Sequence, residues 1–270
     1  MTDPDAYGRA YGFERMMDNL GAIVGPLLAL LLVTLVGVRP AIVLSIIPGL
    51  AAALAIAYAA RHVKRSVRSE HRPIRLHWRP VLRGTLGRLF IGMGAFEIGN
   101  AAATLMILRA TELLSPSRGE HPAAQIAIVL YVGYNVAATL ASLPGGHLSD
   151  RRSAIHSLMI GSAAFLLAYL LFAGAGARVA VLLAGFVLAG IGIGFAETAE
   201  AAAVATLAPE PIRGSAFGLL AGLQSLGNFA ASAVAGLLWT LVSPTAAFLW
   251  LAGWMGIALV AFVATRSRTG

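Results

Sequence analysis

The sequence has no cysteine and few charged residues. Without cysteine, disulfide frameworks, thiolate metal sites and cysteine nucleophiles are excluded. Only 12% of the 270 residues are charged, whereas 58% are hydrophobic and the mean hydropathy is +0.80. Soluble domains carry roughly 25% charge, so a soluble globule, a disordered chain and a coiled coil are all excluded. The composition predicts an all-α polytopic membrane protein.

Motifs for cofactors and enzymatic chemistry are also scarce. All six histidines fall in expected loops or at the edges of apolar segments, so we expect neither an intramembrane haem nor a histidine-rich metal site. The G-x-G-x-G series from Gly190 to Gly194 lies inside an apolar segment without a preceding strand, which argues against a dinucleotide loop. We expect no cofactor, no metal and no enzymatic activity.

Apolar segments recur at the length of membrane-spanning helices, about 20 residues each. They predict about eight transmembrane helices, at 20–37, 40–60, 89–114, 123–143, 154–174, 179–207, 215–242 and 246–264. The polar stretch before the first segment has no early apolar core, so we expect no cleavable signal peptide.

Basic residues lie mostly on one side of these expected spans. Nine of the twenty Lys and Arg fall in the loop 61–88, which contains one acid, Glu70. A soluble protein could bind nucleic acid with such a loop, but between membrane spans the pattern is that of the positive-inside rule. We therefore predict a multi-pass protein of the plasma (cytoplasmic) membrane, with both termini and this loop in the cytoplasm and with no nucleic-acid partner.

Two glycine-bearing segments form an internal repeat. GRAYGFERMMDNLG at 8–21 aligns without gaps to GSAFGLLAGLQSLG at 214–227. Each copy leads into an apolar segment, which indicates equivalent helices in two parallel repeats. Chance similarity through the high glycine and alanine content is the alternative.

Two further motifs accompany this repeat. One is formed by Gly12, Gly21, Gly25 and Pro26, and the other is GGHLSDRRS at 145–153. Together with the repeat they resemble the major facilitator superfamily of transporters, whose proton-linked efflux antiporters carry a glycine-proline motif on the fifth helix and whose C-terminal half has its own version of the G-x-L-S-D-R loop. Glycines favour close helix packing and Gly-Pro a bend, although ordinary packing explains any single glycine equally well.

The resemblance implies a partial superfamily fold. Residues 1–60 then supply the last two helices of the N-terminal bundle, 61–88 a basic cytoplasmic linker, and 89–270 a complete C-terminal six-helix bundle. Four helices expected before residue 8 are missing, through a misassigned start, a gene fragment or a reduced form. We therefore expect self-association, or a partner chain that supplies the missing helices.

Glu97 is an ionisable residue expected deep in the membrane. It lies nine residues past Arg88, about 13 Å along a helix, and shares a helical face with Asn100, Thr104 and Thr111. A charge at that depth costs about 2.5–3.5 kcal/mol on insertion scales, so it predicts a partner or a wet cavity. We interpret Glu97 as a proton-coupling group; a structural hydrogen bond to another span is the alternative.

Uncharged polar residues on several spans predict the walls of a solute cavity. These candidates are Asn100, Thr104, Tyr131, Tyr134, Asn135, Gln224 and Asn228. Such walls suit a neutral or amphipathic organic solute. Hydrogen bonds that merely join helices explain individual positions equally well.

Charged residues near the cytoplasmic ends of spans predict a gate. Asp150, Arg151 and Arg152 follow the fourth expected span, whereas Glu197 and Glu200 share a face of the sixth. We expect a charge network in which Glu200 pairs with Arg151 or Arg152 and closes this face. A purely topological role for the arginines is the alternative.

Together these features predict an alternating-access carrier in the lipid bilayer. It would move a small organic solute, in the direction of efflux and coupled to protons. A non-transporting membrane scaffold, or an inactive transporter fragment, is the alternative.

Overall fold

The structure is a computed structural model that describes residues 6–62 and 78–267, with only the backbone of Pro26, Ala29, Leu30, His62, Trp78 and Arg79. The described residues are almost entirely helical, which confirms the all-α class. Seven helical segments among them are long and apolar enough to cross a membrane. The remaining expected span, 20–37, falls on helix α1 (Tyr7–Val36), which ends one residue earlier. Most of the expected linker at 61–88 lies outside the described residues.

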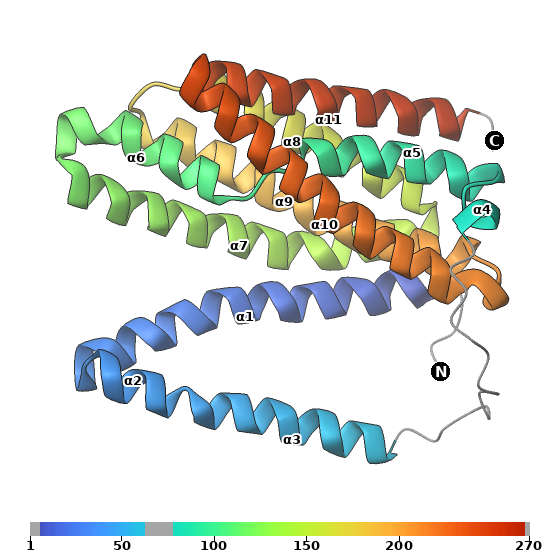
Figure 1. The fold of residues 1–270 in the computed structure, drawn as a ribbon, viewed down its shortest axis with the longest axis horizontal. Helices are drawn as coiled ribbons and strands as arrows, with labels where there is room; N and C mark the ends of the chain where they lie inside the picture. Colours follow the sequence, from blue (N-terminus) through green and yellow to red (C-terminus); the bar gives the residue numbers. More distant parts are fainter. Residues whose placement is uncertain (1–5, 63–77, 268–270) are drawn as a thin grey trace. The chain divides into compact units, whose positions relative to one another are not determined.

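The chain forms two compact units. The first comprises residues 1–20 and 77–270, and the second comprises residues 21–76. The first unit contains the start of α1 and the following helices, which are shown in Figure 1: α4 (Trp78–Val81), α5 (Gly84–Gly99), α6 (Thr104–Arg118), α7 (Glu120–Arg151), α8 (Ala154–Gly174), α9 (Val179–Leu207), α10 (Glu210–Leu241) and α11 (Pro244–Arg266).

The second unit is a helical hairpin with an apolar surface. It consists of the rest of α1, α2 (Val38–Leu44) and α3 (Ile46–His62). Gly37 has a φ of +85°, a left-handed conformation that glycine adopts at little cost, and it lets the chain turn between α1 and α2. Ala41 is the one buried residue among the described side chains of this unit. Its leucines and isoleucines are left exposed, as is expected of helices that face lipid.

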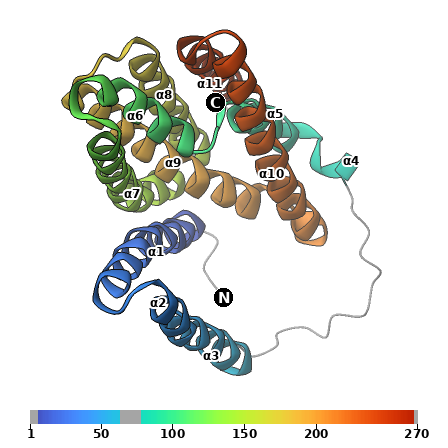
Figure 2. The same cartoon turned by 60° about the vertical axis from the view of Figure 1, so that its left-hand side comes forward.

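The first unit is a bundle of six candidate spans, in which α5 and α6 together make one. Helix α9 packs against α7 and α8, and α11 packs against α8 and α5. Helix α10 runs along α5 and α11 (Figure 2). Helix α9 also contacts both α5 and α10, so these three helices are mutual neighbours.

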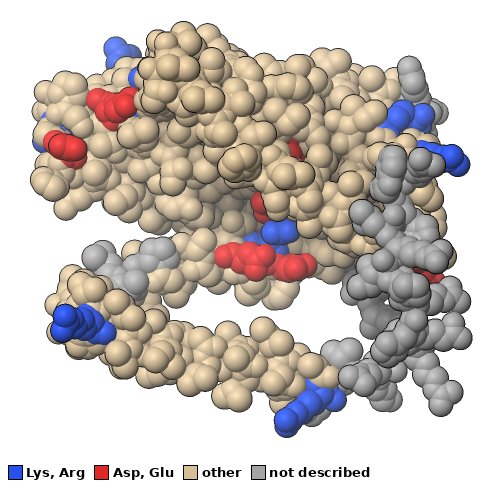
Figure 3. Space-filling model, viewed as in Figure 1, with Lys and Arg blue, Asp and Glu red and all other residues tan. Residues whose placement is uncertain are grey.

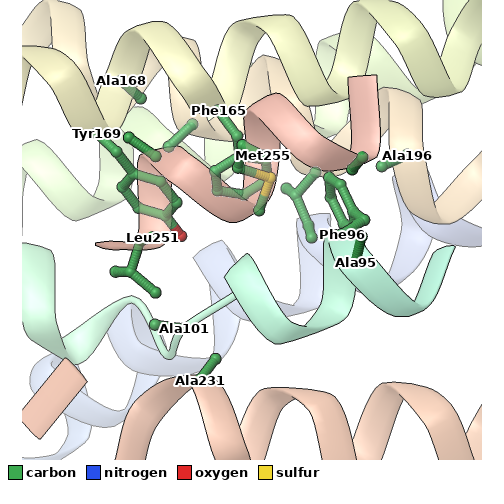
Figure 4. Packing of buried hydrophobic residues seen from close by; sticks show 14 of the residues in the cluster. Ala95, Phe96, Ala101, Phe165, Ala168, Tyr169, Ala196, Ala231, Leu251 and Met255 are labelled. Atoms are coloured by element: carbon green, nitrogen blue, oxygen red, sulfur yellow. The ribbon is translucent and has the colours of Figure 1, made fainter. Parts of the chain in front are cut away.

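An aromatic core holds α5 in this bundle. The rings of Phe96 and Phe165 meet edge-on with centroids 5.6 Å apart, and Tyr169 follows 5.5 Å from Phe165. Met255 of α11 lies beside them (Figure 4). Since Phe96 is fully buried and directly precedes Glu97 in α5, this packing fixes where the Glu97 carboxyl points.

Charged side chains are few on the face drawn in Figure 3; they lie toward its left and right ends and in one group near its centre. The tan, uncharged surface between them is what a bilayer core requires, because each ionised group placed in hydrocarbon is costly. Charged residues in the interior of a span therefore stand out as candidates for function.

Candidate solute and proton site

The span formed by α5 and α6 is broken near its middle. Helix α5 ends at Gly99 and α6 begins at Thr104, and Asn100 leaves helical geometry with φ −86° and ψ 76°. Backbone groups freed by the break are bound by α10. Asn228 Nδ2 donates to the Asn100 carbonyl oxygen at 2.8 Å, and the Ala102 N–H donates to Ser232 Oγ at 3.0 Å. Discontinuous helices of this kind place polar backbone beside a cavity.

This break corrects one prediction from the sequence. A single helical face was expected to carry Glu97, Asn100, Thr104 and Thr111, but the helical period is interrupted after Gly99. Thr104 is exposed, and Thr111 donates its hydroxyl hydrogen to the Ile107 carbonyl within its own helix. Glu97 and Asn100 thus remain together, whereas the two threonines lie apart from them.

A polar cavity of about 310 Å³ lies beside the break. Helices α1, α5, α9 and α10 contribute its walls, which are formed by Arg15, Glu97, Asn100, Glu197, Gln224, Ser225 and Asn228. Each of these side chains has a hydrogen-bonding or charged group. The structure thus brings together four of the predicted cavity and coupling residues, namely Glu97, Asn100, Gln224 and Asn228.

Two buried carboxyl groups lie close to each other, and one of them, that of Glu97, lines this cavity. Glu97 is 1% exposed and Glu200 is 0% exposed, and their charges interact directly. Asn100 Nδ2 donates to Glu97 Oε2 at 3.1 Å, and Gln224 Nε2 donates to Glu200 Oε2 at 2.8 Å. The second oxygen of Glu200, Oε1, is buried and accepts no hydrogen bond from the described residues. A buried acceptor without a donor suggests that a proton or ligand completes the site.

Arg15 is the basic residue in the wall of this cavity. Its Nη1 lies 3.4 Å from Glu197 Oε2 and 3.7 Å from Asp18 Oδ2. From the sequence, Arg15 was interpreted only as one of the basic residues on the cytoplasmic side of the membrane, and no place in a site was predicted for it. The available signal was its place in the polar stretch GFERMMDN, three residues before Asp18 and within the internal repeat.

A second cavity adjoins the first. It measures about 410 Å³ and shares Arg15 and Gln224 with the polar cavity; its other lining residues are Tyr11, Glu14, Ala201, Phe217, Leu220 and Ala221. Tyr11 and Phe217 face each other here with ring centroids 6.0 Å apart. These two aromatic residues occupy aligned positions of the internal repeat, so the two copies of the repeat meet at this cavity.

Asp150 binds the first turn of α1. Its carboxylate accepts hydrogen bonds from the backbone N–H groups of Gly8, at 2.6 Å, and Arg9, at 2.9 Å, and from Arg9 Nε at 3.1 Å. A carboxylate at a helix N-terminus satisfies free donors and complements the helix dipole. The sequence placed Asp150 in a gate but did not reveal this partner.

Close backbone contact between α1 and α7 accompanies this bond. Gly8 lies against the backbone of Gly146, and a Cβ at Gly12 would lie 2.6 Å from the Ser142 carbonyl oxygen. A Cβ added at the motif glycines Gly21 or Gly25 would have no neighbour within 4 Å among the described residues outside its own helix turn. Of the predicted packing motif, Gly12 therefore makes the close contact, and the side chain of Pro26 lies outside the described residues.

The predicted pairing of Glu200 with Arg151 or Arg152 does not form. Glu200 is completely buried and accepts its hydrogen bond from Gln224, whereas Arg151 and Arg152 are exposed at the end of α7. The reason is the rotation of α9, which turns Glu200 toward α10. Glu197 pairs with Arg15 instead.

The polar residues of α7 form a separate group. Tyr131 and Tyr134 stack with ring centroids 5.6 Å apart, and Asn135 donates to the Tyr131 carbonyl at 2.9 Å within the same helix. They are not among the residues that line the two cavities described above. A cavity wall was predicted for them, but Tyr131 and Tyr134 pack against the hydrophobic core, and the backbone carbonyl of Tyr134 lies against Gly190 of α9.

The comparisons with known proteins agree with this architecture. The sequence profile of the Major Facilitator Superfamily matches residues 1–116 and 89–270. The chain belongs to this superfamily. An uncharacterised MFS-type transporter of Methanocaldococcus jannaschii is 30% identical to it over 250 residues, which make up 92% of this chain and 61% of that protein. The chain is thus a multi-pass membrane protein of a transporter superfamily, and it spans 61% of the length of this relative.

Proposed function

We propose that this protein exports a small organic solute across the plasma membrane by alternating access, coupled to proton uptake. The observation that carries the proposal is the contact between the buried carboxyls of Glu97 and Glu200 beside a polar cavity. Both termini lie in the cytoplasm in this proposal. Protons, the solute and a second copy of the chain, or a partner chain, are the proposed partners.

The carboxyl pair has the chemistry of a proton carrier. Two adjacent buried carboxylates repel each other strongly, so such a pair is stable when it shares a proton. Asn100 and Gln224 each donate a hydrogen bond to one carboxyl, so either group is stabilised when it ionises. Release of the proton in one state and its uptake in the other would couple the pair to the membrane gradient.

Two features of the described structure would allow a change of conformation during transport. The break at Asn100 allows α5 and α6 to tilt separately. The bond between Asp150 and the first turn of α1 would hold the cytoplasmic side closed, with Arg151 and Arg152 at the same end of α7. We further propose 1–60 and 89–270 as parts of two transporter bundles joined by 61–88.

Everted membrane vesicles that contain the protein would test this function. A fluorescent probe reports the proton gradient while a panel of cationic, neutral and anionic organic solutes is added one at a time. A transported solute should dissipate the gradient in vesicles with the native chain, and Glu97→Gln should abolish this effect while insertion is retained. Glu210→Gln, which changes an exposed glutamate of α10, is the control. Proton-coupled transport that persists unchanged in Glu97→Gln would refute the role of this residue.

A further inference from the structure

A further cavity, of about 410 Å³, lies where α5 begins, α7 turns into α8 and α9 ends. It has no described lining residue in common with the two cavities of the candidate site. In the proposed topology these helix ends face the cytoplasm. The wall combines aliphatic side chains, such as those of Leu89 and Leu207, with the polar side chains of Thr85, Arg152, Ser153 and Thr206.

Three hydroxyl groups of this wall have a hydrogen left to donate. Thr85 Oγ1 accepts a hydrogen bond from Arg88 Nη2 at 3.2 Å, and Ser153 Oγ accepts one from the Ile155 N–H at 3.1 Å. Because a hydroxyl can donate one hydrogen bond while it accepts others, both still have their hydrogen to give. The Thr206 hydroxyl is exposed and makes no hydrogen bond to the described residues.

Positive charge gathers around the same cavity. Arg152 lines it, and the Arg152 guanidinium has no acceptor among the described residues. Arg88 lies behind Thr85, and its buried Nε also lacks a partner in the described part of the chain. The charges of Arg152 and Arg266 both act on His156, in the first turn of α8. An anion placed here would relieve the repulsion among these groups.

Asp150 is the one carboxylate among the described residues of the wall, and its charge is already compensated. Its oxygens accept hydrogen bonds from the N–H groups of Gly8 and Arg9 and from the Arg9 guanidinium. The side chains of the wall therefore offer donors for which the chain supplies no acceptor. A ligand that suits them has only acceptors and a negative charge, as a phosphate group has.

We propose that this cavity binds the phosphate group of an anionic phospholipid. The phosphate oxygens would accept hydrogen bonds from Arg152 and from the three hydroxyls, and the apolar part of the lipid would pack against the aliphatic side chains of the wall. Basic cavities between helices at the cytoplasmic side of a membrane suit acidic head groups for these reasons. A lipid is favoured over a soluble phosphate because the wall is partly aliphatic and lies at the ends of membrane spans. The bound phosphate would join α5, the turn between α7 and α8, and α9.

Thermal unfolding of the purified full chain in dodecyl maltoside micelles, in a buffer without phosphate, tests this site. Dioleoylphosphatidylglycerol carries both the phosphate and the acyl chains, dioleoylglycerol carries the acyl chains alone, and inorganic phosphate is the anion alone. A ligand that binds the folded chain raises its unfolding temperature with concentration, which gives an apparent Kd. We expect the phospholipid to bind at least about tenfold more tightly than either other probe.

Two neighbouring arginines supply a matched pair of variants. Arg152→Gln removes the guanidinium in the wall and should weaken phospholipid binding by about tenfold or more. Arg151→Gln removes the same charge from the preceding exposed residue, which does not line the cavity, and should change the Kd by less than about twofold. Thr206→Val removes only a hydroxyl and should weaken binding by about threefold to tenfold. Because this hydroxyl has no described partner, the variant should fold like the native chain even if Arg152→Gln does not.

The outcomes separate a phosphate site from general attraction to a basic surface. The inference is overturned if dioleoylglycerol binds as tightly as the phospholipid, if Arg151→Gln weakens binding as much as Arg152→Gln, if folded Thr206→Val binds like the native chain, or if no probe binds. Inorganic phosphate that binds as tightly as the phospholipid, and loses its binding in Arg152→Gln, would support the phosphate site and overturn the lipid as its source. The measurements need no transport, so they stand apart from the test of the proposed function.

Discussion

Replacement of Gly227 by alanine probes the contact on which the candidate site is built. Gly227 of α10 lies against Glu97 of α5, where a Cβ would approach the Glu97 Cβ to 2.5 Å and its backbone carbonyl carbon to 2.9 Å. These atoms cannot move aside by a change of rotamer. Helix α10 must therefore shift away from α5 in Gly227→Ala. The shift would also stretch the hydrogen bond from Asn228, the next residue, to the Asn100 carbonyl.

A second glycine on the same helix supplies the reference for the size of this effect. A Cβ at Gly222 would have no neighbour within 4 Å among the residues that the structure describes, so Gly222→Ala should change only the helix propensity. That propensity gain is about 0.5–1 kcal/mol for each variant and cancels in the comparison. Forcing an extra methyl group into a packed interior costs about 1–3 kcal/mol. Gly227→Ala should therefore be about 1–3 kcal/mol less stable than Gly222→Ala.

Unfolding in mixed micelles measures this difference. Both variants are titrated with a denaturing detergent while helix content is followed by circular dichroism, and the free energies of unfolding are compared. Solute-dependent loss of the proton gradient in everted vesicles serves as a second readout, which should be weakened in Gly227→Ala and kept in Gly222→Ala. Equal stability and equal transport of the two variants would show that α10 does not contact α5 at Glu97, and the described site would be wrong.

Three further outcomes are expected. To test the topology, an impermeant thiol reagent is added outside intact cells; because the native chain has no cysteine, it should label Ser117→Cys and leave Ser66→Cys unlabelled. Labelling of Ser66→Cys would refute the proposed orientation. Asp150→Asn should lower the free energy of unfolding by about 0.5–2 kcal/mol, because the negative charge at the start of α1 is lost, whereas Asp18→Asn at an exposed site should change it little. Equal losses of stability in the two variants would contradict the hydrogen bonds between Asp150 and the first turn of α1. Glu97→Gln should keep its thermal unfolding near that of the native chain, because the amide retains shape and hydrogen bonding; loss of the folded state would favour the structural alternative.

Much of the architecture follows from local sequence features. A bilayer requires about 20 consecutive apolar residues for each span, and this requirement makes the spans readable without any tertiary contact. The repeat likewise anticipates a real neighbourhood, since its aligned residues Tyr11 and Phe217 lie together. Polar residues deep in a span must find partners there, which is why Glu97, Asn100, Gln224 and Asn228 lie around one cavity as proposed from the sequence.

Other features depend on contacts between distant segments, which a single sequence does not show. The break after Gly99 is stabilised by Asn228 and Ser232, about 130 positions away in the chain, so the helical period alone continued the polar face to Thr104. The partner of Glu200 was set by the rotation of α9 against α10. Spacing along one helix shows which residues share a face. Only the packing of the neighbouring helices decides what that face meets, and here it turned Glu200 toward Gln224 and Glu97 rather than toward arginines at the end of α7.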